Sequence, residues 1–336
     1  MTSTPSRKNG ISSLWNLLKI VLAVGLVLYV LSKSGFSNLV STLQSASLFW
    51  LVISGVLYIL LTLLKALQYF VLMRGRLTYP QVLNVTIWQN AISNFFLAGA
   101  GIAAYVTMTR LEHEVKISRS VTIFLLTKVG DLIALWVALL VASSLVWGEM
   151  GLLQTPTILL LAGIGGVILL FFLTIFFRQR FVSVLDRILG WLRISRIKLI
   201  ETGMGYLKSL ASIEQNRVLT TFGLLTLYSF LYLAVTLACA YTNLAIFHLR
   251  LDIFAVIFVT VLTQLVSYFP VSVFGGLGIT ETSALYFWSF FEIPEHVMAP
   301  VLIGMRVVFY LLNVIPLIYL PAYAAWIKPK EQPQNG

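Results

Sequence analysis

The residues of greatest chemical interest are charged side chains inside long apolar runs. Lys128 and Asp131 stand in one run at i and i+3, where they can pair across a single helical turn. Glu281 begins a second run, and Arg306 lies well inside a third. Ionisable groups are costly inside a membrane and often mark a functional site. A lysine and an arginine in such positions can meet an anion, with the acids holding the bases or competing with the anion.

Each of these charges also has a purely structural explanation. Lys128 and Asp131 can form a self-neutralised pair that only fixes helix packing. A carboxylate in the first turn of a helix, as expected for Glu281, stabilises the helix dipole by about 0.3–1 kcal/mol when exposed. Arg306 can extend toward the membrane surface, and Lys65, nearer the end of its run, is expected to do so.

Glycines interrupt two of the apolar runs close to these charges. One group precedes Glu281 and comprises Gly275, Gly276 and Gly278. The other interruption contains Asn94 and Gly101. Glycine permits backbone conformations closed to other residues, and N–H groups at a helix start suit an anion such as phosphate. A tight turn explains the glycines as well, and Asn94 can satisfy backbone groups that the interruption frees.

The composition places these runs in lipid. Hydrophobic residues make up 59% of the 336 residues, charged residues make up only 10%, and mean hydropathy is +0.93. Runs of about 20 apolar residues can cross a hydrocarbon layer of about 30 Å. Their continuity favours helices over the alternating pattern of barrel strands. The predicted fold class is therefore an all-α polytopic membrane protein.

About six runs are predicted to be full spans: Leu14–Ser32, Leu48–Met73, Ser120–Val146, Thr157–Phe177, Val218–Phe247 and Met298–Trp326. Two further runs, Gln81–Thr109 and Asp252–Phe291, are apolar but broken by polar residues, glycine or proline. The first is too short for two full helices, so a re-entrant hairpin opened between Asn94 and Gly101 is predicted. The second is predicted to be a hairpin or two short helices.

Basic residues predict which side of the membrane each end occupies. Arg7 and Lys8 precede the first span, Lys328 and Lys330 follow the last, and the segment 178–217 is rich in bases. Because bases gather in cytoplasmic loops, both termini and the 178–217 loop are predicted to be cytoplasmic. These assignments agree only if the first broken run enters and leaves from the cytoplasm and the second from outside.

Two oppositely oriented broken hairpins, each followed by a full span, predict an inverted repeat, in which substrate sites commonly lie at the broken helices. Lys128 follows Gly101 at nearly the spacing at which Arg306 follows Gly278, although coincidence also explains this. A single transmembrane domain is predicted over 14–326, with cytoplasmic tails at 1–13 and 327–336.

Other classes of function lack their characteristic residues. The net charge of +11 suits orientation in the membrane, and no nucleic-acid-binding motif is present. Cys239 is the single cysteine, and His113, His248 and His296 share no ligand spacing, so no metal site is predicted. No Walker-type loop, nucleophile elbow or His-Glu-x-x-His motif occurs, so neither a cofactor nor an enzymatic activity is predicted.

The stretch Tyr268–Glu281, which reads YFPVSVFGGLGITE, resembles the signature of a family of flippase-like membrane proteins. That family is similar to the transmembrane region of bacterial lysylphosphatidylglycerol synthases. The residues that match the signature are Pro270, Ser272, Gly275, Gly276, Gly278 and Glu281. The family also places an arginine in the following span, which Arg306 fits. The resemblance extends roughly from Leu14 to Trp326.

The first half of the chain matches the family pattern in part. Matching residues are Asn94, Gly101 and Asp131. Lys128 keeps the charge of an arginine, whereas Thr127 replaces an acid. Leu97 replaces a proline, and Tyr105 stands where a basic residue is usual.

The resemblance implies a flippase-like translocase that moves or binds a phosphate-bearing lipid, or lipid-linked headgroup, in an intramembrane polar cleft. Synthase activity is not expected, because the related synthases carry a cytoplasmic transferase domain after this region. The expected partners are membrane lipids, anionic or polyprenyl-phosphate-linked, and the expected location is the plasma (inner) membrane. The expected substrate-binding residues are Lys128, Asp131, Gly275, Gly276, Gly278, Glu281, Arg306, Asn94 and Gly101.

Two alternatives remain open. The chain can be a non-transporting scaffold that presents a lipid to a partner glycosyltransferase or synthase. It can also be a membrane-embedded transferase, although no nucleophile–base pair is evident in the sequence.

Overall fold

The computed structural model describes residues 21, 24–34, 36–73, 75–96, 98–191, 204, 215–268 and 274–327. These residues form helices joined by short connections, and no strand occurs among them. Leu97, Pro270 and Ser272 lie outside this part of the chain, as do the predicted N-terminal tail, residues 328–336, and most of the predicted basic loop beyond Trp191.

Five helical segments in the described residues are long and apolar enough to cross a membrane. They are α3 (Leu48–Leu72), α6 (Ile117–Leu145), α7 (Gln154–Trp191), α9 (Gln215–Ile246), and α12 (Glu295–Val314) continued through η5 (Ile315–Ile318) into α13 (Tyr319–Ile327). A helix pair bent by 86°, Val24–Ser34 with Ser37–Gln44, raises the number to six if it is one span. The predicted all-α polytopic membrane fold is confirmed.

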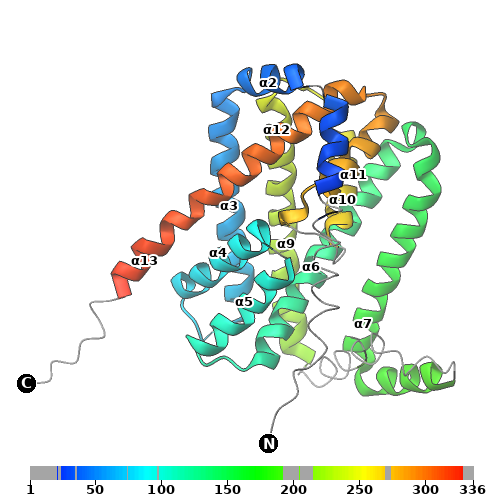
Figure 1. Ribbon diagram of the computed structural model, residues 1–336. Helices are drawn as coiled ribbons and strands as arrows, with labels where there is room; N and C mark the ends of the chain where they lie inside the picture. Colours follow the sequence, from blue (N-terminus) through cyan, green and yellow to red (C-terminus); the bar gives the residue numbers. More distant parts are fainter. Residues whose placement is uncertain are drawn as a thin grey trace, which may run out of the picture.

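Among these five segments, the observed and predicted boundaries differ most at α7, which continues past the end of the predicted span at Phe177 to Trp191. In this extension Val182 is buried while Arg180 and Arg187 are exposed. An apolar stripe with bases on the other face stabilises a helix at a bundle surface, so the start of the predicted basic loop is helical. Figure 1 shows the last part of α7 turned sideways at the lower end of the molecule.

Both broken runs form helical hairpins. The first consists of α4 (Tyr79–Phe95) and α5 (Ala98–Leu111), and the second of α10 (Ile253–Ser267), the short turn η3 (Phe274–Gly276) and α11 (Ile279–Trp288), which ends in η4 (Ser289–Phe291). Each break lies within the predicted interruption. In Figure 1 the hairpins leave from opposite ends of the bundle and point toward each other.

Local sequence explains where the hairpin helices begin. Thr78 precedes α4 and forms a capping box with Gln81, whose side chain accepts from the Thr78 N–H at 2.8 Å. Asp252 caps α10 by accepting from the N–H groups of Phe254 and Ala255. In both cases side-chain oxygens satisfy donors that the first helical turn leaves free.

The tips of the two hairpins touch. The N–H of Phe274 donates to the carbonyl oxygen of Phe96 at 2.7 Å, so backbone groups of the two breaks satisfy each other. Gly275 has φ +67°, and a Cβ atom on it would lie 3.0 Å from the carbonyl oxygen of Asn94. Both the backbone conformation and the close approach therefore require glycine at this position.

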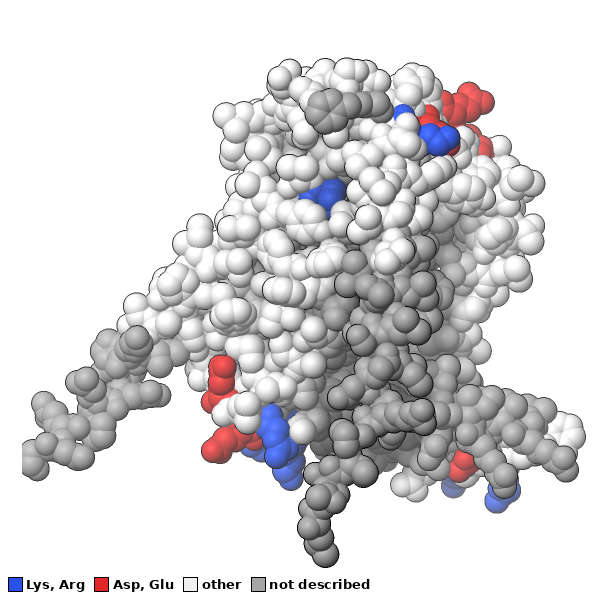
Figure 2. Space-filling model, viewed as in Figure 1, with Lys and Arg blue, Asp and Glu red and all other residues white. Residues whose placement is uncertain are grey.

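The surface agrees with a membrane-embedded bundle. In Figure 2 the charged side chains gather at the two ends of the molecule, and the wide band between them is uncharged apart from one basic patch. Many large apolar side chains on the spanning helices are exposed, for example Val52, Leu159 and Leu227. Such a band is suited to contact with lipid chains rather than water.

Opposite hairpin directions predict opposite accessibility of the loops that follow them. In a Cys239→Ala background, which removes the single cysteine, Glu112→Cys and Glu292→Cys are expected to react with a membrane-impermeant maleimide from opposite sides. The measurement is labelling in intact cells before and after permeabilisation. Both positions should label after permeabilisation, which controls for buried thiols. Labelling of both from the same side would contradict the predicted topology.

Candidate functional site

A cavity of about 580 Å³ lies among α3, α4, α6, α9, α10, α11 and α12, beside the point where the hairpin tips meet. Its charged lining residues are Lys65, Lys128, Asp131, Glu281 and Arg306. Four of these five are the charged residues that the sequence singled out, although they come from distant parts of the chain. They form two polar clusters, one around Asp131 and one around Glu281.

The Asp131 cluster joins three spanning helices. Asp131 Oδ2 accepts from Lys65 Nζ of α3 at 2.6 Å, and both side chains are less than one-tenth exposed. Asp131 Oδ1 accepts from Gln68 Nε2 of α3 and from Ser229 Oγ of α9, each at 3.2 Å. A buried charge is tolerated when it is paired and its remaining lone pairs are hydrogen-bonded. This cluster meets that condition and fixes α3, α6 and α9 together.

Lys128 lies at the edge of this cluster with incomplete charge compensation. Its Nζ atom is 4.0 Å from Asp131 Oδ2, an oxygen that already accepts from Lys65, and 38% of its side chain is exposed. The ammonium also lies 4.9 Å from the centre of the Tyr268 ring. An aromatic face stabilises a cation without neutralising it. Lys128 is therefore positioned to meet an anion in the cavity.

The Glu281 cluster closes the break of the second hairpin. Glu281 Oε2 accepts from the Gly278 N–H at 2.6 Å, which satisfies a free donor at the start of α11. Glu281 Oε1 accepts from Arg306 Nε at 2.5 Å and from Thr280 Oγ1 at 3.0 Å. Arg306 Nη1 donates to the Gly275 carbonyl at 3.0 Å. The arginine thereby ties α12 to both the acid and the backbone of the hairpin tip.

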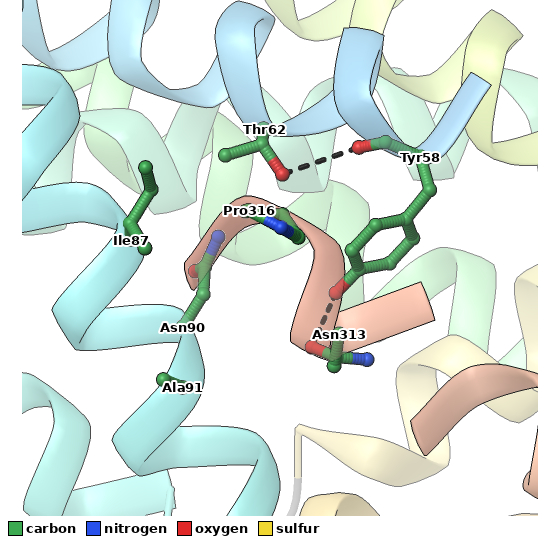
Figure 3. Close-up of a pocket in the computed structure, with 7 residues that line it drawn as sticks. All are labelled: Tyr58, Thr62, Ile87, Asn90, Ala91, Asn313 and Pro316. Atoms are coloured by element: carbon green, nitrogen blue, oxygen red, sulfur yellow. Dashed lines mark hydrogen bonds between the residues drawn. The ribbon is translucent and has the colours of Figure 1, made fainter. Parts of the chain in front are cut away.

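A third set of polar contacts holds the first hairpin. Asn94 Nδ2 donates to Asn313 Oδ1 of α12 at 2.5 Å, and the Tyr58 hydroxyl of α3 donates to the same oxygen. Figure 3 shows Tyr58 reaching Asn313 and Thr62 donating to the Tyr58 carbonyl, around a small pocket of about 10 Å³ that Asn90 also lines. Because α12 binds Asn94 and the second hairpin, it connects the two tips.

The glycines have different positions. Gly275 and Gly276 line the cavity, and Gly278 contributes its N–H to Glu281. Gly101 does not line the cavity: a Cβ atom there would lie 1.9 Å from Ser93 Oγ and 2.6 Å from the Gln89 carbonyl. The prediction that Gly101 contributes to substrate binding is therefore replaced by a packing role, since its lack of a side chain lets α5 approach α4.

Sequence reasoning missed several partners. The expectation that Lys65 extends to the membrane surface is wrong, because its side chain is buried against Asp131. Gln68, Ser229 and Asn313 were not singled out, yet each makes buried or half-buried contacts with the site. The available signal was a polar residue in an apolar run; Lys65 and Gln68 also share one helix face. Among the described residues, no group of three or more His, Cys, Asp or Glu could hold a metal ion.

The fold and cavity define a polytopic helical membrane protein with paired charges and two facing hairpins in its interior. The family model of the lysylphosphatidylglycerol synthase transmembrane region matches residues 16–316, so the chain belongs to that family. The resemblance drawn from the sequence is thereby confirmed. A search of curated proteins finds no match to this chain. Membership relates the protein to lipid modification or lipid flipping at the level of the family.

The Asp131 cluster predicts strongly coupled stability effects. Asp131→Asn leaves the buried Lys65 and the half-buried Lys128 without a counter-charge and should cost about 3–5 kcal/mol of unfolding free energy. The double variant Lys65→Met/Asp131→Asn removes one of the stranded charges and should be more stable than Asp131→Asn alone. Thermal unfolding in nanodiscs measures the order of stability. If the double variant instead loses the sum of the stabilities lost in the two single variants, Lys65 and Asp131 do not act as a pair.

The matched control for that comparison is the surface pair between Lys33 and Glu295, whose side chains are 40% and 43% exposed. Glu295→Gln should cost at most about 1 kcal/mol, because exposed ion pairs contribute little.

The packing role of Gly101 predicts a contrast with its neighbour. Gly101→Ala forces α5 away from α4 and should lower the unfolding free energy by about 1–3 kcal/mol. Gly99→Ala is the control, because a Cβ atom there meets nothing within 4 Å. Thermal unfolding of the two variants tests this packing role. Equal stability of Gly101→Ala and Gly99→Ala would contradict it.

Proposed function

We propose that the protein is a flippase-like translocase that binds and moves a phosphate-bearing lipid headgroup through its intramembrane cavity. The headgroup occupies the polar cavity while the acyl or prenyl chains stay in the surrounding lipid. The cavity volume of about 580 Å³ falls in the range of small-molecule sites and suits a headgroup. The family match supports a link to membrane lipids.

The observation that carries the proposal is the charge balance of the cavity. Its lining has three bases and two acids, a formal charge of +1. Lys65 and Arg306 are engaged at close range by Asp131 and Glu281, so the excess charge resides on Lys128. A cation at membrane depth whose charge is only partly compensated is costly. An anionic headgroup that enters the cavity relieves that cost and gains a charge-assisted hydrogen bond.

The proposed route depends on re-entrant hairpins. We place the end of the bundle that carries Arg76, Arg110, Lys116 and Arg119 in the cytoplasm, following the positive-inside tendency. The first hairpin then enters from the cytoplasm and the second from outside. Both termini lie on the cytoplasmic side of the plasma membrane in this orientation. Facing broken helices around a central polar site suit access from either side.

We also propose that the protein acts without covalent chemistry, since the acids of the cavity are held by bases and hydrogen bonds. One feature favours a second function, namely a scaffold that presents a lipid to a lipid-modifying enzyme. The Glu281 cluster and the contact between Phe274 and Phe96 lock the hairpin tips together, as a rigid binding site would require. A scaffold binds the same headgroup but does not move it.

Lys128→Gln tests the proposal most directly, because Lys128 contributes charge to the cavity without a close partner that its loss would strand. Native mass spectrometry of purified protein should detect retained phosphatidylglycerol or polyprenyl phosphate in the wild type, with at least about ten-fold less in the variant, as expected for a lost charged hydrogen bond. Proteoliposomes with fluorescent phosphatidylglycerol then measure movement of the headgroup across the bilayer.

The control is Arg187→Gln, an exposed base on α7 outside the cavity, which should leave retention and movement unchanged. Retention by the wild type without movement would favour the scaffold. Equal lipid retention by the wild type and Lys128→Gln would refute the proposed site.

A further inference from the structure

We infer that the headgroup is an anionic polyol, a phosphate bearing a sugar or glycerol, and that an aminoacylated headgroup such as a lysyl ester is not bound. The inference rests on the proposed function and adds the chemical class of the substrate. Three observations carry it: a stripe of neutral polar residues along the cavity, oxygen atoms there without partners among the described residues, and the engagement of both acids.

The first observation is the polar stripe on α10. The helix is otherwise apolar, yet one face carries hydroxyl and amide groups that line the cavity, namely Thr260, Thr263, Gln264, Ser267 and Tyr268. Their spacing follows the helical repeat, so they form a continuous line. The Ser267 hydroxyl donates to the Gln264 carbonyl of the same helix at 2.7 Å. Thr260, Thr263 and Gln264 add hydrogen-bonding groups to the lining of the cavity. These groups indicate that the cavity holds something that makes hydrogen bonds.

The second observation concerns hydrogen bonds that the described residues leave unmade. Buried oxygen atoms of three lining residues have no partner within the described part of the chain: Gln89 Oε1, Thr263 Oγ1 and Gln264 Oε1. Buried polar atoms are normally satisfied, and each exception calls for an explanation. Ligand hydroxyl groups, which both donate and accept, fit such a set, as do the water molecules of an empty cavity.

The third observation is that neither acid of the cavity is free. Asp131 accepts from Lys65, Gln68 and Ser229. Glu281 accepts from Arg306 and from the Gly278 N–H. A headgroup ammonium would find no available carboxylate and would face the excess charge of Lys128. Unpaired like charges are a common means of rejecting a wrong ligand.

The stripe and the cation are adjacent. Gln264 and Tyr268, the residue that caps the end of α10, stand one helical turn apart, and Lys128 lies over the Tyr268 ring. If the phosphate of a lipid binds Lys128, the sugar or glycerol attached to that phosphate can lie beside Gln264 and Thr263. Aromatic side chains such as Trp288 and Tyr232 also line the cavity and offer apolar faces to a sugar ring.

The experiment compares lipid retention by native mass spectrometry after exchange in nanodiscs of defined composition. Phosphatidic acid offers phosphate alone, phosphatidylglycerol and phosphatidylinositol add hydroxyls, and lysylphosphatidylglycerol adds ammonium groups. Because each hydrogen bond is worth about five-fold in affinity, the hydroxylated lipids should be retained at least about five-fold above phosphatidic acid. Lysylphosphatidylglycerol should be retained less than phosphatidylglycerol.

The variant Thr263→Val/Gln264→Leu should lose this preference while it retains phosphatidic acid as the wild type does. The control is Thr174→Val on α7, a buried hydroxyl outside the cavity that donates to the Leu170 carbonyl. This control should keep the wild-type preference. The same headgroup chemistry can come from a phospholipid or from a polyprenyl lipid. Retention of a polyprenyl-phosphate-linked hexose is therefore compared with retention of phosphatidylinositol, and the lipid that is retained more strongly identifies the source.

Two failures have different meanings. If lysylphosphatidylglycerol or phosphatidic acid is retained as well as phosphatidylglycerol, while Lys128→Gln still abolishes retention, the polyol inference is overturned and the proposed function stands. If the wild type retains no anionic lipid, the proposed function fails and the inference fails with it.

Discussion

The constraint on which the structure depends is that backbone groups freed inside a membrane must find partners within the protein. Two helix breaks lie in the middle of this bundle. The Phe274 N–H binds the Phe96 carbonyl, and Arg306 and Tyr310 bind the carbonyls of Gly275 and Phe274. A backbone N–H of one break thus binds a backbone carbonyl of the other, and side chains of α12 bind two further carbonyls among the described residues. The polar side chains at the centre of the bundle therefore have a structural role, because they satisfy backbone groups at the two helix breaks.

Charge pairing follows from the same constraint. Arg306 can serve a hairpin carbonyl inside the bundle only if its own charge is neutralised, and Glu281 supplies that neutralisation while it caps α11. Asp131 performs the corresponding task for Lys65 between spanning helices. A structural explanation and a functional explanation of these residues are thus compatible. Lys128 is the exception, because structure alone leaves its charge in excess.

The family relationship and the cavity chemistry describe different levels of function. Membership in the lysylphosphatidylglycerol synthase transmembrane family connects the chain to lipid modification or flipping. In the proposed function, the residues that line this particular cavity select the headgroup. The excess base, the occupied acids and the hydroxyl stripe of α10 together favour a headgroup unlike the lysyl ester of the family's name. A shared scaffold with different lining residues is sufficient to change substrate.

Sequence alone determined the all-α membrane class, five long apolar spans and the positions of both helix breaks, because apolar length and glycine placement are local signals. It also singled out four of the five charged residues that line the cavity, because an isolated charge in an apolar run is a local signal too. It did not determine the partners. Lys65 was misplaced and Gly101 was given a binding role, since burial and close approach depend on which helices become neighbours. Only the tertiary structure brought Asp131 to Lys65 and Asn94 to Asn313, because contacts between distant segments follow from packing, which no local pattern records.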